Sequence, residues 1–227
     1  MEVVFDHKQK LNSEITSYFF VPSKPLHYIA GQFIELTLPI AGNASEKNRW
    51  FTLSSSPTEK LLSITTRHPR DLSNFKKHLA KMKPGDVAHM SQAMGDFVLP
   101  KDPRIPLVFV AAGIGITPMR SMLASQIESR QKRHINTLYF VKSHADACFV
   151  DLLKSTSTTL DIIVTKSKNG ISSMIENIHE YSSTNGFEHV YLSGPEPLVE
   201  NLSNHLSNEG YRDYRLHTDF FPGYNHI

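Results

Sequence analysis

The chain has 227 residues, of which 40% are hydrophobic, so it can bury the core of one or two soluble domains. Its 24 basic and 22 acidic residues nearly cancel and form no basic block, which argues against nucleic-acid binding. The single cysteine, Cys148, excludes an intramolecular disulfide and an iron–sulfur cluster held by cysteines of this chain. We expect a cytoplasmic protein without a membrane span, because no signal-peptide pattern is visible and the longest apolar stretch, Ile105 to Ile116, is short.

In the first hundred residues, short β-like runs alternate with proline- and glycine-rich turns. The runs are Val3 to Phe5, Ile15 to Val21, Gln32 to Leu38, Trp50 to Ser54, Leu61 to Arg67 and Asp86 to Met90. One helix is predicted from Asn74 to Met82, and the polar segment from Ala41 to Asn48 is predicted to be a loop. Short strands at this close spacing favour an antiparallel β-barrel.

A proline-rich connector from Pro100 to Pro106 predicts a boundary between domains 1–101 and 102–227. After it, strands alternate with helices. The predicted strands are Leu107 to Ala111, Asn136 to Val141, Leu160 to Val164, His189 to Leu192 and Arg215 to Phe220. The predicted helices are Pro118 to Gln131, Ala147 to Leu153, which would bury Cys148, Ile171 to Tyr181 and Pro197 to Glu209. This alternation predicts an α/β domain with a doubly wound parallel sheet.

A glycine-rich turn follows the first predicted strand of the second domain. Gly113 and Gly115 lack side chains, as close approach of a backbone to a ligand requires. We expect Thr117 to cap the next helix and Pro118 to occupy its first turn. Such a helix start favours a phosphate. Because Pro118 replaces the last glycine of G-x-G-x-x-G, the turn alone fits a plain strand-to-helix connection equally well.

The strand that begins at Arg49 carries residues that suit a different phosphate-bearing cofactor. Alternation places Arg49 and Phe51 on one face and Trp50 and Thr52 on the other. An arginine pairs bidentately with a pyrophosphate, and an aromatic ring stacks on a flavin. Taken alone, the segment fits an ordinary half-buried strand better. Trp50 fits either the barrel surface or an adenine-side contact.

Six short motifs occur in a fixed order along the chain. They are Arg49-x-Phe51-Thr52, Leu72-Ser73-Asn74-Phe75, Pro84-Gly85-Asp86, Gly95-Asp96-Phe97, Gly113-x-Gly115-x-Thr117-Pro118 and Ser193-Gly194-Pro195. Together they resemble the ferredoxin–NADP reductase superfamily over nearly the whole chain. The resemblance implies a flavin-binding antiparallel barrel followed by a nucleotide-binding α/β domain, with no iron–sulfur domain.

The resemblance implies roles in FAD binding for residues of the first domain. Arg49 would bind the pyrophosphate, Phe51 would stack on the flavin, and Thr52 would bond near flavin N5. Phe51 replaces the tyrosine usual in the family, so one hydroxyl contact is lost while the stacking area is kept. The other implied FAD-binding residues are Trp50, Thr65, Thr66, Arg67, Leu72, Ser73 and Asn74.

In the second domain the resemblance implies a site for NADP or NAD. The residues expected to bind the coenzyme are Gly113, Gly115, Thr117, Pro118, Ser143, Gly194 and Pro195. Ser193 stands where many members carry a cysteine beside the reacting nicotinamide carbon, which puts the rate of hydride transfer in question. Ser143 and Lys142, with Lys166 and Lys168, favour NADP slightly over NAD.

The C-terminal segment resembles the acidic and aromatic segment that passes the flavin in this family. Asp219 is expected to take part in proton transfer or to orient the nicotinamide, which makes Thr52, Ser193 and Asp219 the candidate catalytic residues. Phe220 or Tyr224 is expected to cover the flavin. A terminal strand with core aromatics fits the same residues equally well.

The resemblance implies a flavoprotein oxidoreductase. Hydride would pass from NAD(P)H to FAD, and single electrons would then pass to a separate redox partner such as ferredoxin, flavodoxin or an oxygenase component. Two alternatives stay open: a free flavin or ferric reductase, and a non-catalytic FAD-binding relay or regulatory subunit. We expect a monomer. We also expect no metal site, because the twelve histidines are scattered without a plausible H-x-x-x-H pair.

Overall fold

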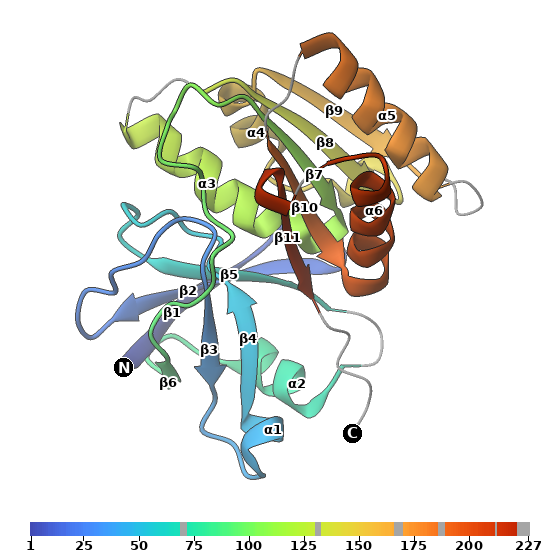
Figure 1. Cartoon of the computed structure of the whole chain (residues 1–227). Helices are drawn as coiled ribbons and strands as arrows, with labels where there is room; N and C mark the ends of the chain where they lie inside the picture. Colours follow the sequence, from blue (N-terminus) through green and yellow to red (C-terminus); the bar gives the residue numbers. More distant parts are fainter. Residues whose placement is uncertain (69–71, 130–132, 166–169, 186–188, 212, 222–227) are drawn as a thin grey trace.

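The computed structural model describes residues 1–68, 72–129, 133–165, 170–185, 189–211 and 213–221. Within these ranges the chain forms an antiparallel barrel followed by a parallel α/β sheet, so the predicted fold class is confirmed (Figure 1). The proposed division after residue 101 lies between the last barrel strand, β6 (Val87–Met90), and the first strand of the second sheet, β7 (Leu107–Ala112). No helix in the described ranges is long and apolar enough to cross a membrane.

The barrel has six antiparallel strands in the order β4-β3-β6-β1-β2-β5. Besides β6 they are β1 (Glu2–Lys10), β2 (Ile15–Pro22), β3 (Phe33–Thr37), β4 (Asn48–Thr52) and β5 (Leu62–Arg67), and two helices, α1 (Ala44–Lys47) and α2 (Asn74–Lys81), lie between them in the chain. A bridge between Leu53 and Ile64 joins the two ends of the sheet and closes the barrel. Phe5, Phe20 and Ile34 fill the interior.

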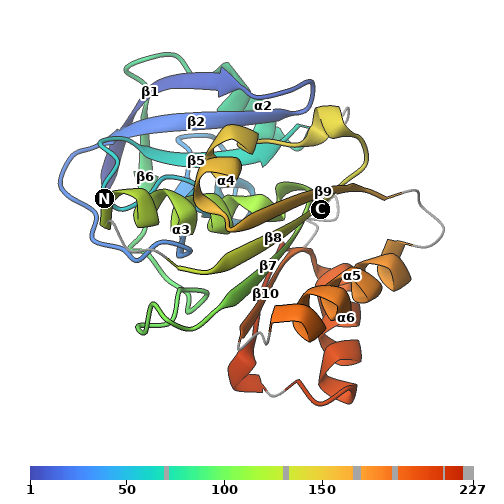
Figure 2. The same ribbon diagram turned by 90° about the horizontal axis from the view of Figure 1, so that it is seen from above.

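The second sheet has five parallel strands in the order β11-β10-β7-β8-β9. The other strands are β8 (Ile135–Val141), β9 (Thr159–Val164), β10 (His189–Pro195) and β11 (Leu216–Phe221), and the helices are α3 (Ile116–Ser129), α4 (Val150–Thr156), α5 (Gly170–Asn185) and α6 (Glu196–Asn208). Met119 and Leu153 pack α3 and α4 on one face. Ile178 and Leu202 pack α5 and α6 on the other (Figure 2). The sheet is therefore doubly wound, with α3 on the barrel side.

Three local predictions are wrong. The predicted helix start at Ala147 moves to Val150, because Phe149 takes a left-handed conformation with φ 61° and interrupts the backbone. Cys148 is consequently buried just before α4 rather than on it, and burial raises the pKa of its thiol to about 11. The predicted loop from Ala41 to Asn48 contains α1, whose start is fixed by a reciprocal pair of hydrogen bonds between Asn43 and Glu46.

Candidate functional site

The three candidate catalytic residues come together at the seam between the two sheets. Thr52 ends β4 of the barrel, whereas Ser193 and Asp219 are register partners on the neighbouring strands β10 and β11. Thr52 is 5% exposed and Ser193 is 2% exposed. Burial raises the pKa of the Asp219 carboxyl to about 7, while the nearby hydroxyls of Thr52 and Ser193 act in the opposite direction. The Asp219 carboxyl is therefore half protonated near neutral pH.

Two buried polar atoms at this seam leave bonding capacity unused. Ser193 Oγ and Asp219 Oδ2 form no hydrogen bond of standard geometry with the described residues. A buried polar atom left without a partner costs about 1–3 kcal/mol, so this arrangement suits a ligand that brings donors and acceptors to the seam. The polar ring edge of a flavin and the amide group of a nicotinamide meet that requirement.

The glycine turn lies against the end of β10. Gly113 has φ +56°, and a Cβ added there would meet nothing within 4 Å, so the space above it is open. A Cβ on Gly115 would lie 2.1 Å from the Ser193 carbonyl oxygen, so this position tolerates only glycine. Thr117 does not cap the helix as predicted. It lies inside α3 and its hydroxyl donates to the Ile114 carbonyl, because a short 3₁₀ turn, Gly113–Gly115, leads directly into α3. Pro118 occupies the first turn, as predicted.

A cavity of about 280 Å³ opens at the carboxyl ends of the parallel strands. The residues that line it come from the glycine turn, three strand ends, α5, α6 and the barrel: Glu14, Ile15, Arg67, Ala112, Gly113, Ile114, Phe140, Val141, Lys142, Asp146, Thr165, Met174, Pro195 and Leu198. Open parallel sheets bind dinucleotides at this edge. Arg67, which was predicted to bind FAD, lines this cavity and forms an ion pair with Glu14 (Arg67 Nη2 to Glu14 Oε2, 2.5 Å). Its role in FAD binding stays a prediction.

Among the described residues, three cations gather where α2 begins: Arg49, Arg67 and Lys76. Ser73 caps this helix by accepting from the Lys76 N–H at 3.4 Å, which confirms the predicted helix start. The Lys76 ammonium donates to the Arg67 carbonyl oxygen at 2.8 Å. Burial, together with the charges of Arg49 and Arg67, lowers the pKa of Lys76. An anion between these groups would relieve their mutual repulsion, and the N–H groups of the helix start would add to its binding.

Lys76 is absent from the residues that sequence reasoning selected. One feature could have revealed it: a lysine in the first turn opposes the helix dipole, which favours anions there. A lysine at this position indicates that the negative charge favoured by the helix start comes from a bound group outside the helix. Leu72 and Asn74 flank the cap, in agreement with the predicted helix start.

The aromatic residues of β4 take different environments. The Phe51 ring packs against Phe75 with centroids 5.9 Å apart, and the Arg49 guanidinium lies over the same Phe75 ring at 5.5 Å. Trp50 is 56% exposed and contacts Phe33, so it lies on the barrel surface, and its contact with an adenine stays a prediction. Thr65, on β5, uses its hydroxyl for Ser17 and Ser54, so only its backbone is available to a flavin.

The remaining predicted site residues have separate environments. The Ser143 hydroxyl donates to Asp146 Oδ2 at 2.9 Å, and Asp146 rather than Ser143 lines the cavity. Thr66 is 6% exposed on β5, next to Thr65. Gly194 lies directly against Ala112, and Phe220 is 44% exposed at the end of β11. Tyr224, Lys166 and Lys168 lie outside the described residues, so their predicted roles stay predictions.

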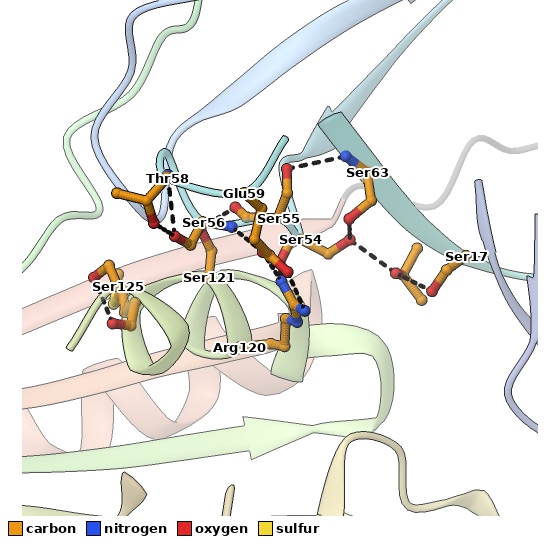
Figure 3. A network of polar contacts seen from close by, with 12 residues as sticks. Ser17, Ser54, Ser55, Ser56, Thr58, Glu59, Ser63, Arg120, Ser121 and Ser125 are labelled. Atoms are coloured by element: carbon orange, nitrogen blue, oxygen red, sulfur yellow. Dashed lines mark hydrogen bonds and ion pairs between the residues drawn. The ribbon is translucent and has the colours of Figure 1, made fainter. Parts of the chain in front are cut away.

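A polar network fastens the barrel to α3 (Figure 3). Arg120 on α3 donates to the Ser54 carbonyl oxygen at 2.8 Å and pairs with both carboxylate oxygens of Glu59, with Nη2 at 2.8 Å from Oε1. Ser121 donates to the Ser55 carbonyl oxygen at 2.5 Å. Because Ser54 lies two residues after Thr52, this network fixes the barrel side of the seam relative to the sheet side. Sequence reasoning missed it, since its members are 61–66 residues apart.

Removing the Arg120 side chain is expected to loosen this connection. Arg120→Ala leaves the Glu59 carboxylate without its ion-pair partner, so we expect a loss of about 2 kcal/mol in unfolding free energy. Urea unfolding followed by tryptophan fluorescence measures it. Arg104→Ala, which breaks the exposed pair with Asp102, is the control and should change the free energy of unfolding far less. Equal effects of the two variants would contradict the role given to Arg120.

Comparisons with known proteins agree with this geometry. Residues 109–204 match the family model described as an oxidoreductase NAD-binding domain. A flavohemoprotein of Bacillus thuringiensis subsp. konkukian is 26% identical over 238 residues, which cover 94% of this chain and 59% of that protein. The chain thus spans only part of the length of such relatives.

Two solved structures share the fold over almost the whole chain. The ferredoxin-NADP+ reductase of Plasmodium falciparum superposes with a TM-score of 0.80 at 17% identity, over 97% of this chain and 95% of that one. The FAD/NAD-binding domain of the nitric oxide dioxygenase of Vibrio cholerae gives 0.75 at 20% identity, over 97% and 98%. Both cover the barrel and the parallel sheet together.

Proposed function

We propose that the chain is a member of the ferredoxin–NADP reductase superfamily and that it passes electrons from NAD(P)H through FAD to a separate acceptor. The matched oxidoreductase NAD-binding model and the shared two-domain fold support this proposal. The observation that carries the proposal is the meeting of Thr52, Ser193 and Asp219 at the seam between the barrel and the coenzyme cavity. A bound flavin would supply the chemistry, since it accepts two electrons as a hydride and releases them singly.

The residues of the chain then have separable tasks. The cations at the start of α2, Arg49 and Lys76, bind the pyrophosphate. The glycine turn, with Gly113 and Gly115, holds the coenzyme at the edge of the parallel sheet. At the seam, Asp219 holds or releases a proton near neutral pH, and the buried Ser193 hydroxyl beside it orients a polar ring edge. Domains 1–101 and 102–227 would carry the flavin and the coenzyme, respectively.

The residues described above define the electron acceptor less closely than they define the two cofactor sites. The flavohemoprotein extends beyond the matched segment, which covers 59% of its length. For this chain we favour a separate redox protein, a ferredoxin, a flavodoxin or an oxygenase component, over a free flavin or ferric reductase. Lys142 at the cavity favours NADP as the coenzyme.

Loading with flavin tests the proposal. Purified chain mixed with FAD and freed of excess by gel filtration should retain one FAD per chain, seen in its visible absorbance. It should then reduce an external one-electron acceptor when NADPH or NADH is added. A chain that stays colourless after this treatment would contradict the proposal. FAD retention without any acceptor reduction would favour a non-catalytic relay or regulatory subunit.

Lys76→Gln is expected to weaken FAD binding about tenfold, because a charge-assisted bond to a phosphate oxygen contributes about 1.5 kcal/mol or more. Lys77→Gln is the matched control: it removes the same charge from the next, exposed position on α2. Quenching of flavin fluorescence measures both dissociation constants, with FAD and with riboflavin, which has no phosphate. An equal loss for the two flavins would place Lys76 away from the phosphates.

A further inference from the structure

Away from the cofactor sites, three metal-binding side chains gather on the outer helices. His205 and Glu209 lie one helical turn apart at the C-terminal end of α6, and His179 faces them from α5. His179 Nε2 lies 2.8 Å from Glu209 Oε2, and His205 Nε2 lies 3.1 Å from Glu209 Oε1. All three possible ligand atoms lie within 4.8 Å of one another. One carboxylate thus holds two imidazoles toward a common point.

We propose that His179, His205 and Glu209 form a binding site for a divalent transition-metal ion, best suited to zinc. Two imidazole nitrogens and one carboxylate oxygen are a ligand set that zinc prefers, with water in the fourth position. Ligands at the usual zinc distances lie about 3.3–3.6 Å apart around a tetrahedral ion. The present separations of 2.8 and 3.1 Å need to open only slightly to admit the ion.

The site is accessible from solvent. The side chains of His179, His205 and Glu209 are 42%, 46% and 36% exposed, respectively, so an ion reaches them without any opening of the fold. Magnesium and calcium prefer sets made of oxygen ligands, so they should bind poorly here. The sequence search missed the cluster because α6 carries His-x-x-x-Glu rather than two histidines, and the third ligand is on another helix.

Binding would join the two helices that cover one face of the parallel sheet. Met174 on α5 and Leu198 on α6 line the coenzyme cavity nearer the N-terminal ends of the same helices. From Leu198 to the ligands on α6 is roughly 10–16 Å along the helix axis. The ion would therefore hold α5 and α6 together at the end away from the cavity, without touching the coenzyme.

Calorimetric titration of the purified, chelator-treated chain with zinc chloride at pH 7.5 tests the site. We expect one zinc per chain with a dissociation constant in the micromolar range and no heat from millimolar magnesium. A hundredfold excess over that constant should raise the unfolding temperature by about 5 °C. His179→Ala and His205→Ala should each weaken zinc binding at least tenfold.

A control variant and a measurement at lower pH complete the test. His78→Ala removes an exposed histidine outside the cluster and should leave zinc binding unchanged. Because protons compete with zinc for imidazole nitrogen, binding should also weaken as the pH is lowered to 5.5. Absence of zinc binding by the folded wild-type chain, or zinc binding that persists in both His179→Ala and His205→Ala, would overturn the proposal. Neither result depends on whether the chain binds a flavin.

Discussion

Gly115→Ala is expected to lower the rate of flavin reduction by NAD(P)H about a hundredfold while the chain keeps its FAD. The added Cβ would lie 2.1 Å from the Ser193 carbonyl oxygen and 2.7 Å from the Gly194 nitrogen. Backbone atoms cannot rotate away, so the turn and the end of β10 must separate. A displacement of about 1 Å at reacting groups costs on the order of a hundredfold in rate. The barrel, which would bind FAD, lies outside this contact.

Rapid mixing of FAD-loaded wild type and variant with coenzyme measures the effect. Gly210→Ala is the control: φ there is +96°, so the substitution strains the backbone by about 1 kcal/mol, but the new Cβ meets nothing within 4 Å. It should reduce flavin within about twofold of the wild-type rate. If Gly115→Ala did the same, the contact between the turn and β10 would have no part in positioning the coenzyme.

Asp219→Asn is expected to remove a pH dependence of stability that runs from about pH 4 to pH 7. Burial raises the pKa of this carboxyl from 3.8 in the unfolded chain to about 7 in the folded one. Between these values the folded chain holds a proton that the unfolded chain has lost. The unfolding free energy therefore falls as the pH rises from about 4 to 7, and levels off above 7. At about 1.4 kcal/mol per pKa unit, the shift from 3.8 to about 7 lowers the unfolding free energy by roughly 4 kcal/mol by pH 8.

The amide that Asp219→Asn introduces stays neutral at every pH. The flavin-free variant should therefore be more stable than wild type at pH 8 by about this amount and nearly equal to it at pH 3.5. Urea unfolding at the two pH values gives both differences. The rate of flavin reduction in the loaded variant should also lose the change that wild type shows near pH 7. Asp151→Asn, at an exposed position on α4, is the control and should show neither effect. A stability difference that is the same at both pH values would contradict the raised pKa.

Periodicity in the sequence is sufficient to predict the fold, since the barrel and the parallel sheet both depend on local patterns. Short alternating runs separated by Pro22, Gly31 and Pro57 predict the barrel, and strands alternating with helices predict the parallel sheet. The left-handed Phe149 could not be foreseen, because a non-glycine residue with positive φ leaves no pattern in the sequence. The cap of α1 could have been found, since Asn43 and Glu46 have the spacing of a capping box.

The candidate site is harder to predict than the fold. Thr52, Ser193 and Asp219 were selected through a family resemblance, and only the folded chain shows that β4, β10 and β11 bring them together. Lys76 and the pair of Arg120 with Glu59 were missed, because their partners are distant in sequence and their charges look like those of any exposed residue. Burial and neighbouring charge, which define these roles, are properties of the fold.

Anaerobic mixing of the FAD-loaded chain with NADPH, and separately with NADH, tests the central claim most directly. We expect the oxidised flavin absorbance to be lost in a single turnover with at least one coenzyme. We also expect a slower loss when the transferred hydrogen of the coenzyme is replaced by deuterium. A flavin that stays oxidised with both coenzymes, in a chain that retains one FAD, would contradict the claim that the seam between barrel and sheet transfers hydride.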